Sequence, residues 1–240
     1  MTDEFDKTFA LTHRPTAARP LAGLTVLMVE DSRFASEAVR LLCLRSGARL
    51  RRADSLRAAE RHLAVYRPSA IIVDLGLPDG NGLDLIARLH AAEPRIPAIL
   101  ATSGDDAALA QAQGAGADAL LAKPLASLGS FQETLLAALP GAYRPAGPRA
   151  VAEDRVAPDR IALIEDLARV ADVLSNGEDE EKLGYAARFL TGVARTAEDE
   201  SLERAARELE HRRAAGEPVL SEMAQVAGLL QDRLDRRAVV

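Results

Sequence analysis

Asp74 stands at the end of a short apolar run, Ala70–Val73, and a loop rich in glycine and proline follows it. A buried strand gains nothing from such an aspartate, because a buried charge is costly unless it is paired or liganded. Other apolar runs of the chain also end in polar groups. These groups are Glu30, Asp31, Thr102, Ser103 and Lys123. Three carboxylates, two hydroxyls and one ammonium are therefore candidates for a single site.

Such a set suits phosphoryl transfer. Clustered carboxylates repel one another unless a cation lies among them, and a few hard oxygen ligands favour Mg²⁺. An aspartate beside Mg²⁺ can act as a nucleophile toward phosphorus. Lys123 could then supply positive charge, and Thr102 a hydroxyl, to the oxygens of the transferred group. Lysine is rare here: Lys7, Lys123 and Lys182 are the only three among 30 basic residues.

The elements that must position these groups are five apolar runs, which alternate with stretches of helical periodicity. The runs cover residues 25–30, 48–53, 70–74, 97–102 and 119–123. Alternation of this kind predicts an α/β fold, a doubly wound five-stranded parallel sheet with helices on both faces. The run at 48–53 is polar enough to be an edge strand. Ligands of such sheets bind at the carboxyl ends of the strands, where the polar groups stand.

Residues 23–140 resemble the receiver domain of bacterial two-component response regulators. The resemblance is carried by "VLMVEDSRF", "IIVDLGLPDGNGLDLI", "ILATSGD" and "GAGADALLAKP", in this order and spacing. It implies a flavodoxin-like sheet of strand order 2-1-3-4-5. It also implies a donor that carries a phosphohistidine, either a histidine kinase or a histidine phosphotransfer protein.

The resemblance implies a role for each site residue. Asp74 would be the phosphoacceptor, and Glu30 and Asp31 would hold Mg²⁺ together with Asp74. The backbone carbonyl of Gly76 would complete the protein ligands of the metal. Thr102 and Lys123 would contact the phosphoryl group, and the Lys123–Pro124 peptide bond is expected to be cis. A receiver catalyses only its own phosphorylation and dephosphorylation, so the chain is not expected to be an enzyme.

One position departs from the family pattern. The residue three before the lysine is usually Tyr or Phe and reports the state of the site, but here it is Leu120. The surface through which phosphorylation is transmitted is therefore expected to differ.

The second half of the chain has a different pattern. Residues 141–158 are rich in proline and glycine and are typical of a linker. Four amphipathic stretches follow, and the first is expected to end at Asn176–Gly177. Their apolar stripes predict a separate all-α helical bundle over residues 159–237. With residues 1–20 as a flexible tail, the receiver domain is expected to cover 21–140.

Within this half, residues 185–216 resemble the centre of a histidine phosphotransfer domain. The matching positions are Ala187, Leu190, Gly192, Leu202, Leu209 and Glu210. Arg188 stands where that family has its phosphorylated histidine, and a guanidinium cannot accept a phosphoryl group. The resemblance implies a degenerate phosphotransfer domain that can still dock on its partners but cannot be phosphorylated. Its expected partners are a kinase, a phosphotransfer protein, another receiver or a second copy of this chain.

Two alternatives compete with this reading. Ala224 and Gly228 are spaced as in a helix-turn-helix near residues 218–237, which would make the protein a DNA-binding transcriptional regulator. The apolar residues of this segment also fit one continuous amphipathic helix. Residues 151–240 carry 13 Lys and Arg against 20 Asp and Glu, so nucleic acid is not an expected partner. An enzymatic second half would need a metal cluster or a nucleophile–base pair, which its pattern does not supply.

Composition and hydropathy limit the class of protein and its expected location. The net charge is −6, and the single cysteine, Cys43, is placed at helical spacing and is expected to be a core residue. The acidic N-terminus does not resemble a signal peptide, and no run is long and apolar enough to span a membrane. The expected protein is therefore a cytoplasmic response regulator in which phosphorylation of Asp74 controls the helical half.

Overall fold

The computed structural model describes residues 15–145, 153–175 and 180–235. The described residues fall into two compact units, one within the ranges 1–30 and 38–157 and the other within the ranges 31–37 and 158–240. The predicted boundaries of tail, receiver, linker and bundle stay a prediction. The part of the predicted tail at 1–14 lies outside the described residues, as does the expected helix stop at Asn176–Gly177.

The first unit contains one five-stranded parallel sheet, as predicted. Its strands are β1 (Thr25–Val29), β2 (Arg49–Ala53), β3 (Ala70–Asp74), β6 (Ala98–Ser103) and β7 (Ala119–Ala122). Their spatial order is β2-β1-β3-β6-β7, which confirms both the expected order and the edge position of β2. All neighbouring strands are parallel, so their carboxyl ends meet at one edge of the sheet.

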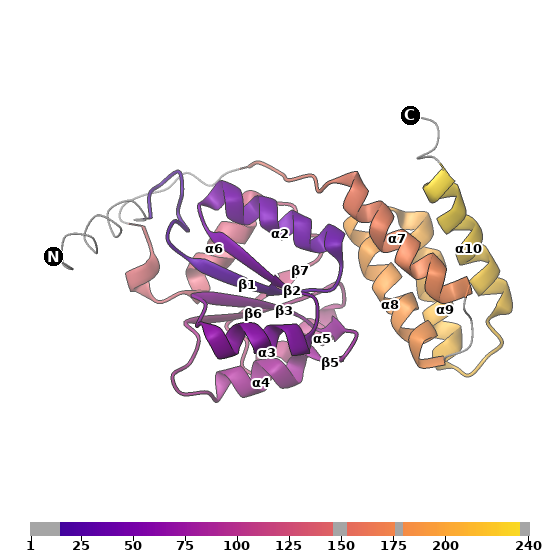
Figure 1. Cartoon of the computed structure of the whole chain (residues 1–240), viewed down its shortest axis with the longest axis horizontal. Coiled ribbons are helices and arrows are strands. Elements are labelled where there is room, and N and C mark those ends of the chain that lie inside the picture. The colour runs from indigo at the N-terminus through magenta and orange to yellow at the C-terminus, as the bar shows by residue number, and fades with distance from the viewer. Residues whose placement is uncertain (1–14, 146–152, 176–179, 236–240) are drawn as a thin grey trace. The chain divides into compact units, whose positions relative to one another are not determined.

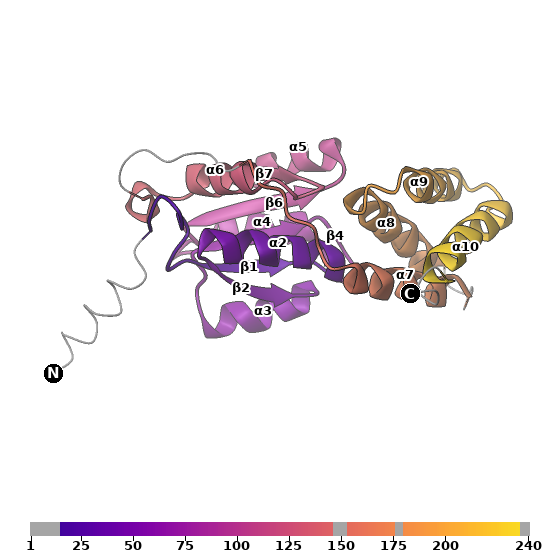
Figure 2. The same ribbon diagram turned by 90° about the horizontal axis from the view of Figure 1, so that it is seen from above.

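Helices cover both faces of this sheet (Figure 1). Helices α2 (Arg33–Ser46) and α6 (Leu128–Ala138) lie on one face, and Figure 2 shows them over the sheet from above. Helices α3 (Leu56–Val65), α4 (Gly82–His90) and α5 (Asp106–Gly114) lie on the other. Side chains alternate along a strand, so Val26 and Met28 enter the core under α2, while Leu27 enters the opposite core. Cys43 is buried in the α2 core, as expected.

A small hairpin after β3 was not predicted. Strands β4 (Gly76–Leu77) and β5 (Gly80–Asn81) pair antiparallel, with Gly76 opposite Asn81 and Leu77 opposite Gly80. Strands of two residues are too short to produce a periodic pattern in the sequence.

Part of the predicted linker packs against the first unit. A 3₁₀ helix, η1 (Gly141–Tyr143), follows α6. Farther along, the backbone N–H of Val156 donates to the carbonyl of Ala126 at 2.9 Å, and the Val156 side chain joins the core under α2 and α6. A single buried valine in a stretch rich in proline and glycine leaves no periodic signal.

Four helices follow, as predicted: α7 (Arg160–Ser175), α8 (Glu180–Thr196), α9 (Glu200–Ala214) and α10 (Leu220–Asp235). Their apolar stripes form one aliphatic core, in which Leu190, Leu209, Val226 and Leu230 are fully buried. Helix α10 runs without a turn from Leu220 to Asp235, so the helix-turn-helix considered for this segment is not formed there. Within the described ranges, no helix has the length and apolar character needed to cross a membrane.

Asp199 ties the start of α9 to α10. Its side chain accepts from the backbone N–H of Leu202 at 3.1 Å and from Nε of Arg233 at 2.6 Å. The hydrogen bond from Arg233 lowers the pKa of Asp199 to about 2, so folding favours the carboxylate. We expect Asp199→Asn, which keeps an N-cap acceptor but loses the charge facing Arg233, to lower the free energy of unfolding of these helices by about 0.5–1 kcal/mol at neutral pH.

This stabilisation should depend on pH in a defined direction. Because the pKa of Asp199 is lower in the folded chain than in the unfolded one, the contribution is present above about pH 4 and is lost as pH falls toward 2. Hydrogen exchange of α9 amides across this range should therefore show the wild type and the variant converging at low pH. Asp172→Asn, at an exposed position of α7, is the control and should behave as the wild type.

Candidate functional site

The acidic residues predicted for the site lie together at the carboxyl edge of the sheet. Glu30 and Asp31 follow β1, and Asp74 is the last residue of β3. Each of the three offers one carboxylate oxygen, and these oxygens lie within 4.8 Å of one another. All three residues are buried, so their mutual repulsion is weakly screened by water.

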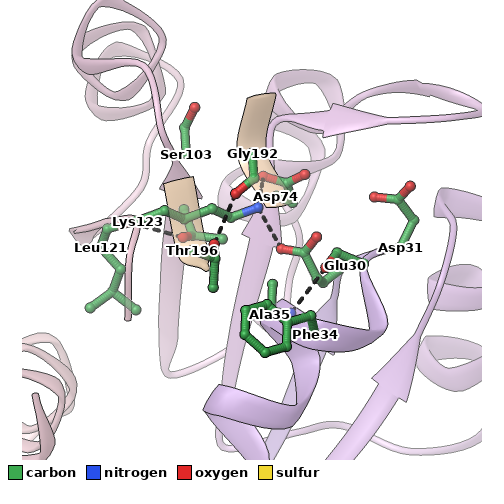
Figure 3. Close-up of polar contacts among 12 residues, drawn as sticks. Glu30, Asp31, Phe34, Ala35, Asp74, Ser103, Leu121, Lys123, Gly192 and Thr196 are labelled. Carbon is green, nitrogen blue, oxygen red and sulfur yellow. Dashed lines mark hydrogen bonds and ion pairs between the residues drawn. The ribbon is translucent and has the colours of Figure 1, made fainter. Parts of the chain in front are cut away.

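Lys123 partly balances this negative charge. Its Nζ lies 2.7 Å from Oε2 of Glu30 and 3.0 Å from Oδ1 of Asp74, and Figure 3 shows it reaching between the two carboxylates. Burial disfavours the charged form of the lysine, but the two carboxylates outweigh this effect and raise its pKa. The ammonium is therefore held in its charged form beside Asp74. The Lys123–Pro124 bond is cis, as expected.

Thr102 and Ser103 end β6, the neighbour of β3. Thr102 is in register with Asp74 and is fully buried. Its hydroxyl donates to the carbonyl of Leu121 at 2.8 Å, so its proton is directed to the backbone of β7. Its predicted contact with a phosphoryl group stays a prediction. Leu120 also lies on β7 and is partly buried against the core under α3, α4 and α5.

Two glycines lie close to Asp74, and one of them, Gly82, allows a close approach of the backbone. A β-carbon added to Gly82 would lie 2.2 Å from the Asp74 carbonyl oxygen, which leaves no room for any other residue. A β-carbon added to Gly76 would lie 3.7 Å from Oδ2 of Asp74. Gly76 is therefore a neighbour of the Asp74 carboxylate, and the metal-binding role of its carbonyl stays a prediction.

Asp31 belongs to the second compact unit and has partners within it. The Tyr185 hydroxyl donates to Oδ2 of Asp31, and Nη2 of Arg169 donates to the Asp31 carbonyl at 3.1 Å. Burial, and then the charge of Asp31, raise the pKa of Tyr185, so its hydroxyl keeps the proton that it donates.

Asp166 of α7 holds the residues that follow Asp31. Its carboxylate is fully buried and accepts from the Ser32 hydroxyl at 2.7 Å and from the backbone N–H groups of Arg33 at 3.1 Å and Phe34 at 3.0 Å. A carboxylate is favoured at the N-terminus of a helix, here α2. Sequence reasoning missed Tyr185, Arg169 and Asp166. The only signal in the sequence was that Asp166 lies next to the apolar stripe of the amphipathic helix α7.

The donor set fits a small hard cation. Three buried carboxylates outnumber the two cations beside them, Lys123 and Arg169, whose Nη1 lies 3.7 Å from Oδ2 of Asp31. Oxygen ligands in this number suit Mg²⁺ with part of its water shell retained. A carboxylate held beside a lysine and a cation has the surroundings that an attacking oxygen needs in phosphoryl transfer, where charge on the transferred oxygens must be neutralised.

A family model matches this part of the chain. The response regulator receiver domain model covers residues 26–133, which include every residue predicted for the site.

Relatives and solved structures match over the same part. The chain is 35% identical over 116 residues to the KDP operon transcriptional regulatory protein KdpE of Escherichia coli, over 48% of this chain and 50% of that protein. It is 31% identical over 102 residues to the virulence transcriptional regulatory protein PhoP of Salmonella typhimurium, over 42% of this chain and 46% of that protein. A response regulator from Chloroflexus aurantiacus has 28% identity and a TM-score of 0.45, over 48% of this chain and 96% of that structure.

The match to curated relatives is partial. The chain spans about half of their length, and the matched part is the part that contains the acidic cluster. The comparisons give no support to the expectation that nucleic acid is excluded as a partner, because both relatives are named as transcriptional regulators. The parallel sheet, the acidic cluster with its lysine and the family match agree: residues 26–133 form a response regulator receiver domain of two-component signalling.

Proposed function

We propose that this protein is a cytoplasmic phosphorylation-dependent regulator in which Asp74 accepts a phosphoryl group. The donor is the phosphohistidine of a histidine kinase or of a histidine phosphotransfer protein. Phosphorylation then controls the protein–protein interactions of residues 159–237. Mg²⁺ is held by the carboxylates of Glu30, Asp31 and Asp74 and by the carbonyl of Gly76.

The observation that carries this proposal is the placement of Lys123 between Glu30 and Asp74. An ammonium buried with two carboxylates serves no packing purpose, and its pairing with Asp74 leaves that oxygen next to a positive charge. When bound, Mg²⁺ supplies a second positive charge for the oxygens of the incoming phosphoryl group. Lys123 orients the Asp74 carboxylate and neutralises charge on the same group, while Thr102 contributes its hydroxyl.

Replacing Asp74 by Asn should abolish phosphorylation. Asparagine keeps the size of the side chain but lacks the nucleophilic oxygen. Intact-mass spectrometry with Mg²⁺ and a phosphorylated kinase, or an acyl phosphate of low molecular weight, should show one added phosphoryl group in the wild type and none in Asp74→Asn. Asp84→Asn, an exposed acid in the first turn of α4, is the matched control and should be phosphorylated normally. Incorporation in Asp74→Asn at the wild-type rate would refute the assignment.

Phosphorylation is proposed to reach the helices through residues 31–37. This segment belongs to the same compact unit as residues 158–240, and it contains both the metal ligand Asp31 and the three donors to Asp166. A cation and a phosphoryl group at the acidic cluster would change the charge beside Asp31, and hence the balance of its contacts with Tyr185 and Arg169.

This route predicts a measurable change in α7 and α8. Hydrogen exchange of the full chain, with and without the phosphodonor, should differ in α7, in α8 and in residues 32–34. The difference should be absent in Asp74→Asn and reduced in Tyr185→Phe, which loses the hydrogen bond to Asp31 but keeps the ring that packs against Phe189. Equal exchange in the phosphorylated and unphosphorylated wild type would contradict this route.

The proposed partner surface lies on α8. Ala187 and Leu190 are buried in the helical core, whereas Arg188 between them is exposed at the position of the missing histidine. This arrangement supports a degenerate phosphotransfer fold that docks a receiver domain, whose acidic pocket would attract the guanidinium.

The docking surface can be tested by charge reversal. Arg188→Glu should lower the affinity for purified receiver domains, measured by biolayer interferometry, whereas Arg204→Glu, at an exposed position of α9, should not. Equal loss in both variants would indicate a net-charge effect. Binding of duplex DNA at low salt, combined with no receiver binding, would instead favour a transcriptional regulator.

A further inference from the structure

The hairpin that follows the phosphoacceptor is attached to a distant helix by one carboxylate. Asp79 forms part of the turn between β4 and β5. Its Oδ1 accepts from the backbone N–H of Leu56 at 2.8 Å, and its Oδ2 accepts from that of Arg57 at 3.0 Å. Leu56 and Arg57 are the first two residues of α3, whose N–H groups have no partner within the helix. Both oxygens of one side chain thus bind the start of α3.

Apolar contacts bring the hairpin to the same place. Leu77 of β4 is buried in the core that includes Leu56 and Ala58 of α3. A β-carbon added to Gly80 would lie 2.8 Å from Cδ1 of Leu56, and Gly80 has a φ of +151°, so a side chain there would be obstructed and strained. The hairpin tip therefore fits closely over the first turn of α3.

The base of the same hairpin lies beside the acidic cluster. Gly76 is paired with Asn81 across the hairpin, and its backbone is next to the Asp74 carboxylate. Asn81 in turn caps α4 by accepting from the backbone N–H of Leu83 at 2.9 Å. Within β4, Gly76 lies at the base of the hairpin beside Asp74, and Leu77 leads to the tip that is attached to α3. We therefore expect a shift of the tip to move Gly76.

We propose that Asp79 is a positioning residue for the metal site: it holds the hairpin on α3 and so sets the position of Gly76, whose carbonyl would be a metal ligand, relative to Asp74. This inference rests on the proposed function. Asp79 is itself exposed and contributes nothing to the core, so its two hydrogen bonds are its structural contribution. The groups that support metal ligands typically affect metal affinity strongly although they do not touch the ion.

A second cap on the same helix provides a matched control. The Ser55 hydroxyl accepts from the backbone N–H of Ala58 at 3.2 Å. Ser55→Ala removes a capping bond from α3 without touching the hairpin, whereas Asp79→Asn removes at least one bond between the hairpin and α3, because an amide has a single acceptor oxygen. Both variants should lower the melting temperature of the full chain modestly.

Mg²⁺ titration separates the two variants. Isothermal titration calorimetry of the full chain with MgCl₂, in the absence of a phosphodonor, should give a dissociation constant for Mg²⁺ that is about 10-fold higher for Asp79→Asn than for the wild type. Ser55→Ala should match the wild type. In phosphorylation assays Asp79→Asn should need more Mg²⁺ for half-maximal rate and should recover most of the rate at saturating Mg²⁺, because Asp74 and Lys123 are unchanged.

Each outcome decides a separate point. An Mg²⁺ affinity of Asp79→Asn within twofold of the wild type, together with a lowered melting temperature, would show that Asp79 only caps α3 and would overturn the inference. The same follows if Ser55→Ala weakens Mg²⁺ binding equally. If wild-type protein binds no Mg²⁺ and accepts no phosphoryl group, the proposed function itself fails, and the inference fails with it.

Discussion

The repulsion among three buried carboxylates is the constraint on which the receiver part depends. Glu30, Asp31 and Asp74 are brought within 4.8 Å of one another because parallel strands all present their carboxyl ends at one edge. The buried ammonium of Lys123 and the Arg169 guanidinium beside Asp31 balance only part of this charge. The surrounding strands are apolar on both faces, and their burial offsets the cost of such a cluster. The remaining negative charge makes this edge suited to a small hard cation.

Much of this arrangement could be predicted from the sequence, because it follows from local patterns. Five apolar runs and the helical stretches between them determine the parallel sheet, and a parallel sheet places the residues that follow its strands together. The four later helices were predicted for the same reason, since each has a strong apolar stripe, whereas the strand order was predicted from the resemblance to receiver domains. The proximity of Lys123 to Glu30 and Asp74 required no more than this.

The rest could not be predicted, because it depends on contacts between residues far apart in the chain. The contacts of Asp79 with the start of α3, and of Asp166 with residues 32–34, join segments that share no periodic pattern. Val156 is also buried by contacts with distant residues, although the composition of its own segment is typical of a linker.

These long-range contacts divide the residues predicted for the metal site into two kinds. Glu30 and Asp74 are fixed by the sheet, since Asp74 is in register with Thr102 and the backbone N–H of Glu30 donates to the carbonyl of Ala53 at 2.9 Å. Asp31 and Gly76 instead lie on segments after the strands, and their positions depend on α7 and α8 in one case and on α3 in the other. Segments held by a few hydrogen bonds open more readily than a sheet core does. Charge added at the cluster should therefore leave the sheet unchanged and alter these two segments, one of which is part of the helical unit.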